Sequence, residues 1–255
     1  MMAAGEESRF QPTRLLYYED AYAREFMAKV LAVQKTGEKW RVTLDQTDFY
    51  PLGGGQPSDN GMLKGVKGAI AVMDVRVERG VVVHFGNLEG SITEGEAVMG
   101  SIDWDRRYAL MRNHTLAHLM AEAVRKATGL SGEVVGSGLG VDKARLDIAS
   151  ESSLGPFLAE IQKAANSVIE ENRAVEIKTM QRNEAEEYVA RFRENLKTLP
   201  LHVQEVRIIE VKDWHACACG GTHVKSTGEI GEAEILRRMS KGKGVERLEF
   251  RAKTS

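Results

Sequence analysis

The sequence predicts an α+β fold in two parts, a small N-terminal β-barrel domain over residues 1–100 and an α+β domain over residues 101–255. Two observations lead to this division. The first hundred residues contain several short apolar runs separated by turn residues, which is typical of a small barrel. After Gly100 longer amphipathic stretches alternate with short apolar runs, which indicates helices mixed with strands.

Two hairpins account for most of the predicted barrel, and each has a turn that contains glycine. The paired strands are residues 26–33 with 39–45 and residues 69–78 with 81–85. The turns lie at Gly37-Glu38 and Arg79-Gly80. The segment 51–61 between the hairpins holds too many glycines for regular structure, so we expect a loop there.

The second part is expected to begin with a long helix, which Asp103 or Asp105 caps and which ends near Thr128, before Gly129. The remaining elements follow from periodicity and breaker residues. They are paired strands within 133–149, helices over 154–172 and 183–196, strands over 175–179 and 203–211, and a closing hairpin over 229–250 that turns at 241–244.

The sequence argues against three classes of protein. No apolar run approaches the roughly 20 residues of a membrane helix, so no membrane partner is expected. Residues 1–7 show no basic stretch followed by an apolar one, so we expect no secretory signal and a cytoplasmic location. The net charge of −2 excludes a strongly basic nucleic-acid binder, and binding RNA would need a local cluster of positive charge.

One such cluster lies between Arg237 and Lys253, where seven basic residues accompany two acidic ones. A solvated strand face and a contact with nucleic acid explain this cluster equally well.

A histidine pair, His114 and His118, lies within the expected long helix. Residues four apart share a helix face and lie about 6 Å apart along the axis, so two imidazoles can bind one cation. Two histidines that only form hydrogen bonds in the core explain the pair about as well. A protease helix of the zincin type would need Glu directly after the first histidine, as the general base. This chain has Thr115 there, so we do not expect a metalloprotease of that type.

A second pair, Cys219 and His223, brackets two glycines that let a short loop turn both side chains toward one point. One sulfur and three imidazole nitrogens fit the preferences of zinc, so we expect one Zn²⁺ per chain. His215 and Cys217 are also possible ligands. Four protein ligands favour a structural ion slightly, and exchange of one ligand for water or substrate would permit catalysis.

Three separated motifs occur in order along the chain. They are Asp45–Pro51 continuing through Gly53–Pro57, Arg112–Thr115 with His118, and Cys219–Val224. Together they resemble the editing domain of alanyl-tRNA synthetase and its free-standing relatives, the AlaX proteins. The resemblance extends from about Phe26 to Phe250, and the glycine-rich N-terminal part is similar to the medium-sized AlaX class.

This resemblance implies a β-barrel domain joined to a zinc-containing editing domain. It implies hydrolysis of the ester that links an amino acid to the terminal adenosine of tRNA. The implied partner is tRNA(Ala) that carries serine or glycine in place of alanine. No protein partner is inferred.

Seven further residues are candidates for the reaction or for tRNA binding. Thr47 would position water or substrate, and Gln56 would orient a water or the adenosine, although ordinary structural hydrogen bonding explains both residues as well. Gly54 and Gly55 can approach RNA closely because they lack side chains. Phosphate contacts are expected from Lys241 and Lys243 at the hairpin tip and from Arg247 nearby.

Three alternatives stay open. A structural zinc module would bind RNA without hydrolysis, and another zinc hydrolase would act on small esters or amides. An editing enzyme of the threonyl branch would hydrolyse Ser-tRNA(Thr), since that synthetase has a related domain. The glycine-rich loop favours the alanine branch by resemblance only.

Overall fold

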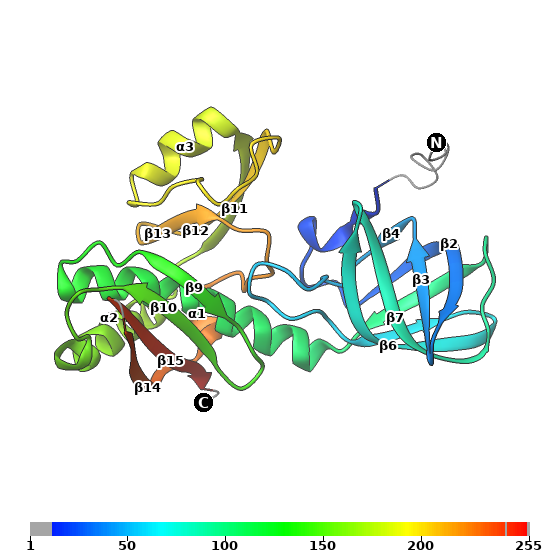
Figure 1. Ribbon diagram of the computed structural model, residues 1–255, viewed down its shortest axis with the longest axis horizontal. Helices are drawn as coiled ribbons and strands as arrows, with labels where there is room; N and C mark the ends of the chain where they lie inside the picture. Colours follow the sequence, from blue (N-terminus) through cyan, green and yellow to red (C-terminus); the bar gives the residue numbers. More distant parts are fainter. Residues whose placement is uncertain (1–11, 243, 254–255) are drawn as a thin grey trace. The chain divides into compact units, whose positions relative to one another are not determined.

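The computed structural model describes residues 12–242 and 244–253, and the chain is a mixed α/β structure that forms two compact units (Figure 1). One unit runs up to Gly53 and continues over Pro57–Arg107. The other comprises Gly54–Gln56 and the chain from Tyr108 onward. The expectation about a secretory signal concerns residues 1–7, which lie outside the described residues. Lys243, a predicted phosphate contact, also lies outside them.

A closed six-stranded barrel forms the first unit, and its neighbouring strands are antiparallel. Around the barrel the strands are β2 (Glu25–Thr36), β3 (Lys39–Leu44), β7 (Val81–Ser91), β6 (Lys67–Glu78), β5 (Gly61–Lys64) and β8 (Ala97–Ile102). Exposed and buried side chains alternate along the first half of β2, so one face of the strand lines the core. Leu44, Leu63 and Ile70 are fully buried in that core.

Both expected hairpins are present, as β2 with β3 and as β6 with β7. Strand β7 continues to Ser91, beyond the expected end at residue 85. Strands β5 and β8, which the sequence analysis missed, pair with each other and close the barrel. This unit also contains a short parallel pair, β1 (Arg14–Leu15) with β4 (Gln46–Thr47), and the 3-10 helix Leu16–Tyr18.

Helix α1 (Trp104–Thr128) carries the chain into the second unit. Asp103 caps the helix, because its Oδ1 accepts the backbone N–H of Arg106 at 3.1 Å. Gly129 follows the last turn with a φ of 71°, as a C-terminal glycine does. Every residue from Leu110 to Arg125 is buried, so this part of α1 is a core helix on all its faces.

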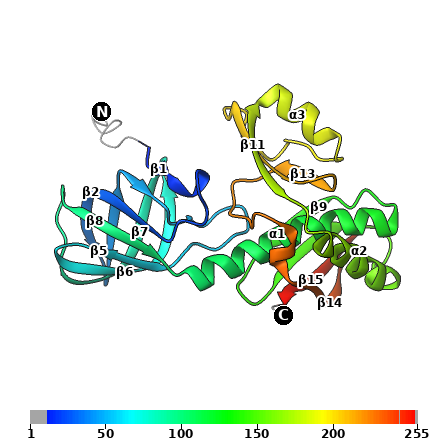
Figure 2. The ribbon, with the colours of Figure 1, turned by 180° about the vertical axis from the view of Figure 1, so that it is seen from behind.

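Two antiparallel sheets complete the second unit (Figures 1 and 2). The four-stranded sheet has the order β14 (Glu232–Gly242), β15 (Val245–Lys253), β10 (Ala144–Ala149) and β9 (Val134–Gly138). The three-stranded sheet has the order β11 (Val175–Gln181), β12 (Glu205–Val211) and β13 (His215–Ala218). Helix α2 (Leu158–Glu170) packs against β14, and α3 (Arg182–Ala190) packs on the three-stranded sheet.

Two helices are shorter than expected. Helix α2 begins at Leu158 because Gly155–Phe157, which contains a proline, forms a separate 3-10 turn. Helix α3 ends at Ala190, and the positive φ of 61° at Arg193 is incompatible with a helix that continues. A further 3-10 helix spans Thr227–Ile230. Among the residues that the structure describes, no helix combines the length and the apolar character needed to cross a membrane.

Candidate metal centre

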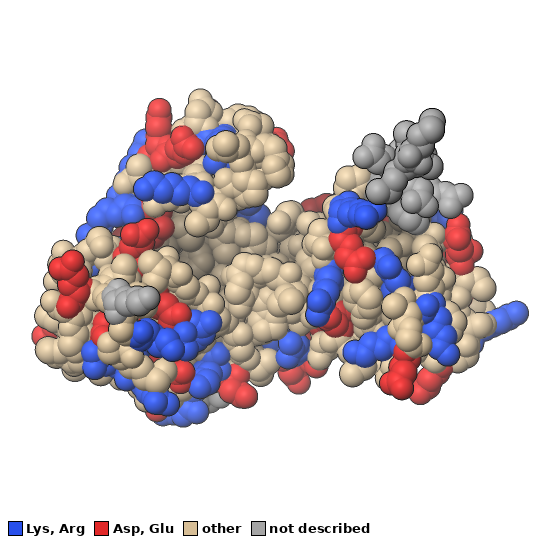
Figure 3. All heavy atoms as spheres, viewed as in Figure 1, with Lys and Arg blue, Asp and Glu red and all other residues tan. Residues whose placement is uncertain are grey.

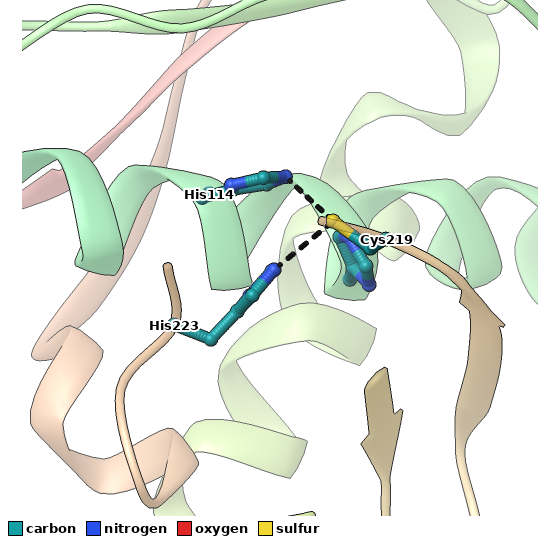
Figure 4. A group of neighbouring side chains, drawn as sticks. His114, Cys219 and His223 are labelled. Carbon is teal, nitrogen blue, oxygen red and sulfur yellow. Dashed lines mark hydrogen bonds between the residues drawn. The ribbon is translucent and has the colours of Figure 1, made fainter. Parts of the chain in front are cut away.

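Four side chains of the second unit converge on one point. His114 and His118 lie one turn apart on α1, Cys219 follows β13, and His223 lies in the loop beyond it. Their ligand atoms all lie within 4.8 Å of one another, and Figure 4 shows two of the histidine rings directed at the cysteine sulfur. The structure thus brings together the four residues that the sequence spacing selects.

The spacing of these atoms fits a tetrahedral ion. Sγ of Cys219 lies 3.4 Å from Nε2 of His114 and 3.3 Å from Nε2 of His223. Ordinary zinc–sulfur and zinc–nitrogen bonds at tetrahedral angles would place these atoms about 3.6 Å apart. One thiolate and three imidazoles also form a donor set that zinc prefers. The residues therefore fit zinc in donor type and in spacing.

Burial keeps the histidines of this centre neutral. Burial lowers the pKa of His118 to about 4, with a smaller contribution from the Arg207 guanidinium, and it holds the pKa of His114 and of His223 well below the ordinary value. Neutral imidazole is the form that binds a metal. Burial raises the pKa of the Cys219 thiol, and a bound divalent cation would favour its thiolate instead.

Gln56 fixes the orientation of one histidine. Its Oε1 lies 2.9 Å from Nδ1 of His114 and accepts the backbone N–H of Thr222 at 3.1 Å, while its Nε2 donates to Thr222 Oγ1 at 2.9 Å. An amide oxygen only accepts, so Nδ1 of His114 carries the proton and Nε2 keeps its lone pair for a metal. Gln56 is fully buried and belongs to the second unit, although Pro57 belongs to the first.

Thr115 supports a second histidine. Its Oγ1 donates to the carbonyl of Met111 at 3.0 Å and accepts the backbone N–H of Val224 at 3.2 Å. The same oxygen lies 3.1 Å from Nδ1 of His223 and accepts its proton, which leaves Nε2 of that ring facing Cys219. The position that a zincin gives to a general base is thus occupied here by a hydroxyl that hydrogen-bonds His223.

The glycine loop packs tightly against α1. A Cβ at Gly221 would lie 2.2 Å from Cε1 and 2.5 Å from Nδ1 of His114, so no side chain fits there. Arg207 on β12 holds the same loop, because its Nη1 donates to the carbonyls of Cys219 at 2.7 Å and of Gly221 at 3.0 Å. The glycine at position 221 is therefore needed for the close contact of the loop with His114, as well as for the turn of the chain.

Thr47 lies in the barrel unit, where its buried hydroxyl lies 2.8 Å from Nε2 of His84 and accepts the backbone N–H of Phe49 at 3.1 Å. Burial lowers the pKa of His84 to about 4, so the ring is neutral. Its Nδ1 lies 3.1 Å from the carbonyl of Val42 and must donate there. Nε2 of His84 consequently accepts the hydroxyl proton of Thr47.

The glycines before Gln56 are explained by backbone geometry and packing. Gly54 and Gly55 both have positive φ, at 58° and 82°. The carbonyl of Gly55 accepts the backbone N–H of Leu139 at 2.9 Å, and a Cβ on Gly55 would lie 2.6 Å from Oγ of Ser137. A close approach of these glycines to RNA stays a prediction.

The expected phosphate contacts differ in their surroundings. Lys241 is exposed near the end of β14, beside the turn of the closing hairpin. Arg247 donates to both carboxylate oxygens of Asp147, at 2.6 and 2.8 Å, and so links β15 to β10. On the face that Figure 3 shows, Lys and Arg side chains of this unit are interspersed with Asp and Glu.

Sequence reasoning missed several supporting residues. Thr115 and Thr222 each adjoin a ligand histidine in sequence, and that adjacency is a signal for a hydrogen-bonding role. Arg207 and His84 carry no comparable signal, because each meets its partners only in the folded chain, across 12 to 14 positions for Arg207 and 37 for His84.

Family models match both ends of the chain. One described as tRNA synthetases class II (A) matches residues 6–106, and one described as threonyl and alanyl tRNA synthetase second additional domain matches residues 206–249. The second match contains Cys219 and His223. The first match spans the barrel strands, while His114 and His118 lie outside both matches.

Individual relatives match nearly the whole chain. An alanyl-tRNA editing protein AlaX-M from Methanosarcina acetivorans is 39% identical, with 93% of this chain and 98% of the relative covered. One from Methanosarcina barkeri is 40% identical over the same shares. The alanine–tRNA ligase of Sulfurisphaera tokodaii is 39% identical over 94% of this chain, which spans only 26% of that ligase. The chain belongs to the AlaX-M family of alanyl-tRNA editing proteins.

Proposed function

We propose that the protein is a zinc-dependent hydrolase that removes wrongly attached amino acids from alanine tRNA. Its proposed substrate is Ser-tRNA(Ala), with Gly-tRNA(Ala) as a second candidate. Membership of a family named for alanyl-tRNA editing supports the reaction class. The observation that carries the proposal is the convergence of four potential ligand atoms within 4.8 Å of one another. Hydrogen bonds from Gln56 and Thr115 orient two of the imidazoles.

A separate editing site solves a problem of selectivity that a synthetase faces when it attaches alanine to tRNA. A synthetase pocket that admits alanine also admits the smaller glycine. It rejects serine, which adds a hydroxyl, by only about a hundredfold in comparable cases. Hydrolysis of the wrong ester at a separate site supplies the missing discrimination.

The chain's own residues have defined tasks in this proposal. His114, His118, Cys219 and His223 would hold the zinc, which when bound supplies a Lewis acid for a water or a carbonyl oxygen. Gln56 and Thr115 keep two of the imidazoles in the tautomer that binds a metal.

Thr47 is proposed to position water or the substrate's hydroxyl. Its hydroxyl donates to the neutral ring of His84 and accepts the backbone N–H of Phe49, so one oxygen lone pair is left to accept a further hydrogen bond. Lys241, Lys243 and Arg247 are proposed to contact tRNA phosphates. Because Asp147 engages Arg247, the lysine at position 241 is the stronger candidate of the two that the structure describes.

A structural zinc module that binds RNA without hydrolysis is the second candidate function. The observation that favours it is the number of protein ligands, because four are typical of structural zinc sites.

The decisive experiment measures loss of amino acid from Ser-tRNA(Ala), Gly-tRNA(Ala), Ala-tRNA(Ala) and Ser-tRNA(Thr) with purified, zinc-loaded protein. We expect rapid release of serine from tRNA(Ala), with the alanyl ester spared. Binding of tRNA(Ala) without release from any substrate would favour the structural module. Release from Ser-tRNA(Thr) in preference to Ser-tRNA(Ala) would move the protein to the threonyl branch.

A further inference from the structure

His118 belongs to two groups of metal-ligating side chains. In the second group it meets His215 and Cys217, and ligand atoms of these three residues also lie within 4.8 Å of one another. His215 and Cys217 are two positions apart on β13, so both side chains leave the strand on the same face. All three residues lie in the second unit.

The distances within this second group resemble those of the first. Sγ of Cys217 lies 3.7 Å from Nδ1 of His118, close to the about 3.6 Å that separates sulfur and nitrogen ligands of one tetrahedral zinc. The rings of His118 and His215 lie at 90°, with centroids 5.4 Å apart. An imidazole has nitrogens on two sides, so His118 can turn Nε2 to the first group and Nδ1 to the second.

An unpartnered nitrogen points to a missing ligand. His215 is 2% exposed, and within the part of the chain that the structure describes its Nδ1 has no hydrogen-bond partner. A buried polar atom without a partner costs free energy, and a cation bound at Nδ1 itself would remove that cost. The chain also places one of its two cysteines here, which supplies a soft donor.

We propose that His118, His215 and Cys217 form a second, weaker site for a thiophilic divalent cation such as Zn²⁺ or Cd²⁺. Binding releases two protons to solvent, one from the Cys217 thiol and one from Nδ1 of His118. The His118 ring then bridges two cations as imidazolate. The site is weaker than the first because it has three protein ligands and must deprotonate a neutral imidazole.

This site goes beyond the editing reaction and does not depend on the identity of the tRNA. It rests on the assignment of His118 to the first centre. A cation in the second site would place positive charge beside His118, which is also a candidate ligand of the first centre. Binding of a cation at one centre should therefore change the affinity of the other through the His118 ring.

Cadmium titration of the full-length, metal-free protein tests the proposal, because each thiolate bound to cadmium adds ultraviolet charge-transfer absorption. The chain has two cysteines, one in each group, so each step has its own reporter. We expect two steps, a tight one from Cys219 and a weaker one from Cys217, ending at two ions per chain. Calorimetry in buffers of different ionisation enthalpy should show two protons released in the weaker step.

Variants separate the two sites. Cys217→Ser should abolish the weaker step and leave the tight one, and His215→Asn should weaken that step at least tenfold while both thiols remain. Cys219→Ser is the matched control, which should remove the tight step. One ion per chain in the unmodified protein, with the absorption of a single thiolate and no effect of Cys217→Ser, would overturn the proposal.

One ion bound by both thiolates would also overturn it, because Cys217 would then be a ligand of the first centre. The titration of the unmodified protein decides these outcomes even where a variant fails to fold, which circular dichroism would reveal. Failure of the editing proposal would appear elsewhere, as a zinc-loaded protein that leaves Ser-tRNA(Ala) intact.

Discussion

The amide oxygen of Gln56 lies 2.9 Å from Nδ1 of His114, although the two residues are 58 positions apart in sequence. The contact makes the glycine-rich segment a support of the metal centre, and the backbone N–H of Thr222 fixes which end of the amide faces the ring. Gln56, a candidate for orienting water or the adenosine, thus contacts a candidate metal ligand in the structure.

Gln56→Ala should weaken zinc binding about 10- to 100-fold, because His114 loses the acceptor that fixes its tautomer. Competition with a chromophoric chelator measures the zinc affinity directly. Gln46→Ala is the matched control, since that glutamine donates to the carbonyl of Met27 within the barrel unit. Equal zinc affinity in both variants would show that Gln56 does not support the ligand.

His118→Ala should lose both zinc and hydrolysis of Ser-tRNA(Ala), with the rate falling by a factor on the order of 100 or more. Metal analysis and a deacylation assay on the same preparation measure the two losses. His202→Ala, which removes an exposed histidine of the same unit, should change neither. A metal-free variant with full activity would refute the assignment of zinc to catalysis.

Gly221→Ala should damage the centre without removing any ligand, because the added methyl would lie 2.2 Å from the ring of His114. We expect zinc affinity to fall at least about tenfold, because the methyl would push the His114 ring away from the position in which Gln56 holds it. At Gly53 the same substitution meets its nearest neighbours at 3.9 Å, and Gly53→Ala should bind zinc normally. Chelator competition on both variants distinguishes collision from a general effect of losing a glycine.

The barrel unit should become less stable as pH rises. Asp48 is fully buried, and neither of its carboxyl oxygens has a hydrogen-bond partner among the described residues. Burial raises its pKa from 3.8 to about 7, an effect that Arg107 opposes and that Asp59 and Asp20 reinforce. The folded protein therefore binds this proton more tightly than the unfolded chain, so stability falls between pH 4 and 7.

Asp48→Asn removes this dependence. Its gain in Tm over the unmodified protein should grow from pH 4 to pH 7 and then level off, reaching roughly 5 °C at pH 8. Thermal unfolding followed by circular dichroism across this range provides the measurement. A gain that is the same at pH 5 and pH 8 would contradict a raised pKa for Asp48.

Lys241→Ala should weaken binding of tRNA(Ala) and lower the salt dependence of binding by about one counterion. Filter binding over a range of salt concentrations gives the slope. Lys163→Ala, on helix α2, is the control for loss of a positive charge elsewhere in the same unit. An unchanged slope would remove Lys241 from the proposed contact surface.

Local geometry explains what the sequence could predict. The turn of a helix fixes the relation of His114 to His118, and the short glycine loop does the same for Cys219 and His223, so spacing indicates these four residues as candidate ligands while leaving His215 and Cys217 open. Asp103 and Gly129 likewise mark the ends of α1 through local capping chemistry.

Long-range contacts explain what it could not. Gln56 meets Thr222 across 166 positions, and no periodicity or spacing rule reaches that far. Strand β5 has only four residues and gains its stability from pairing with β6 and β8, so its own sequence gives little signal. Helix α3 ends early because of the backbone conformation near Arg193, which its charged sequence does not announce.

The division of the ligands between helix α1 and the loop after β13 sets an order of events during protein synthesis. A growing chain holds His114 and His118 long before Cys219 and His223 have been made, so it has only half of the donors. Binding of the proposed metal by all four residues would have to wait until the ribosome has passed residue 223 and the contact between Gln56 and Thr222 can form. If the protein binds zinc as proposed, acquisition of the ion would be a late step of maturation, and cellular zinc supply at that moment would govern the yield of zinc-loaded protein.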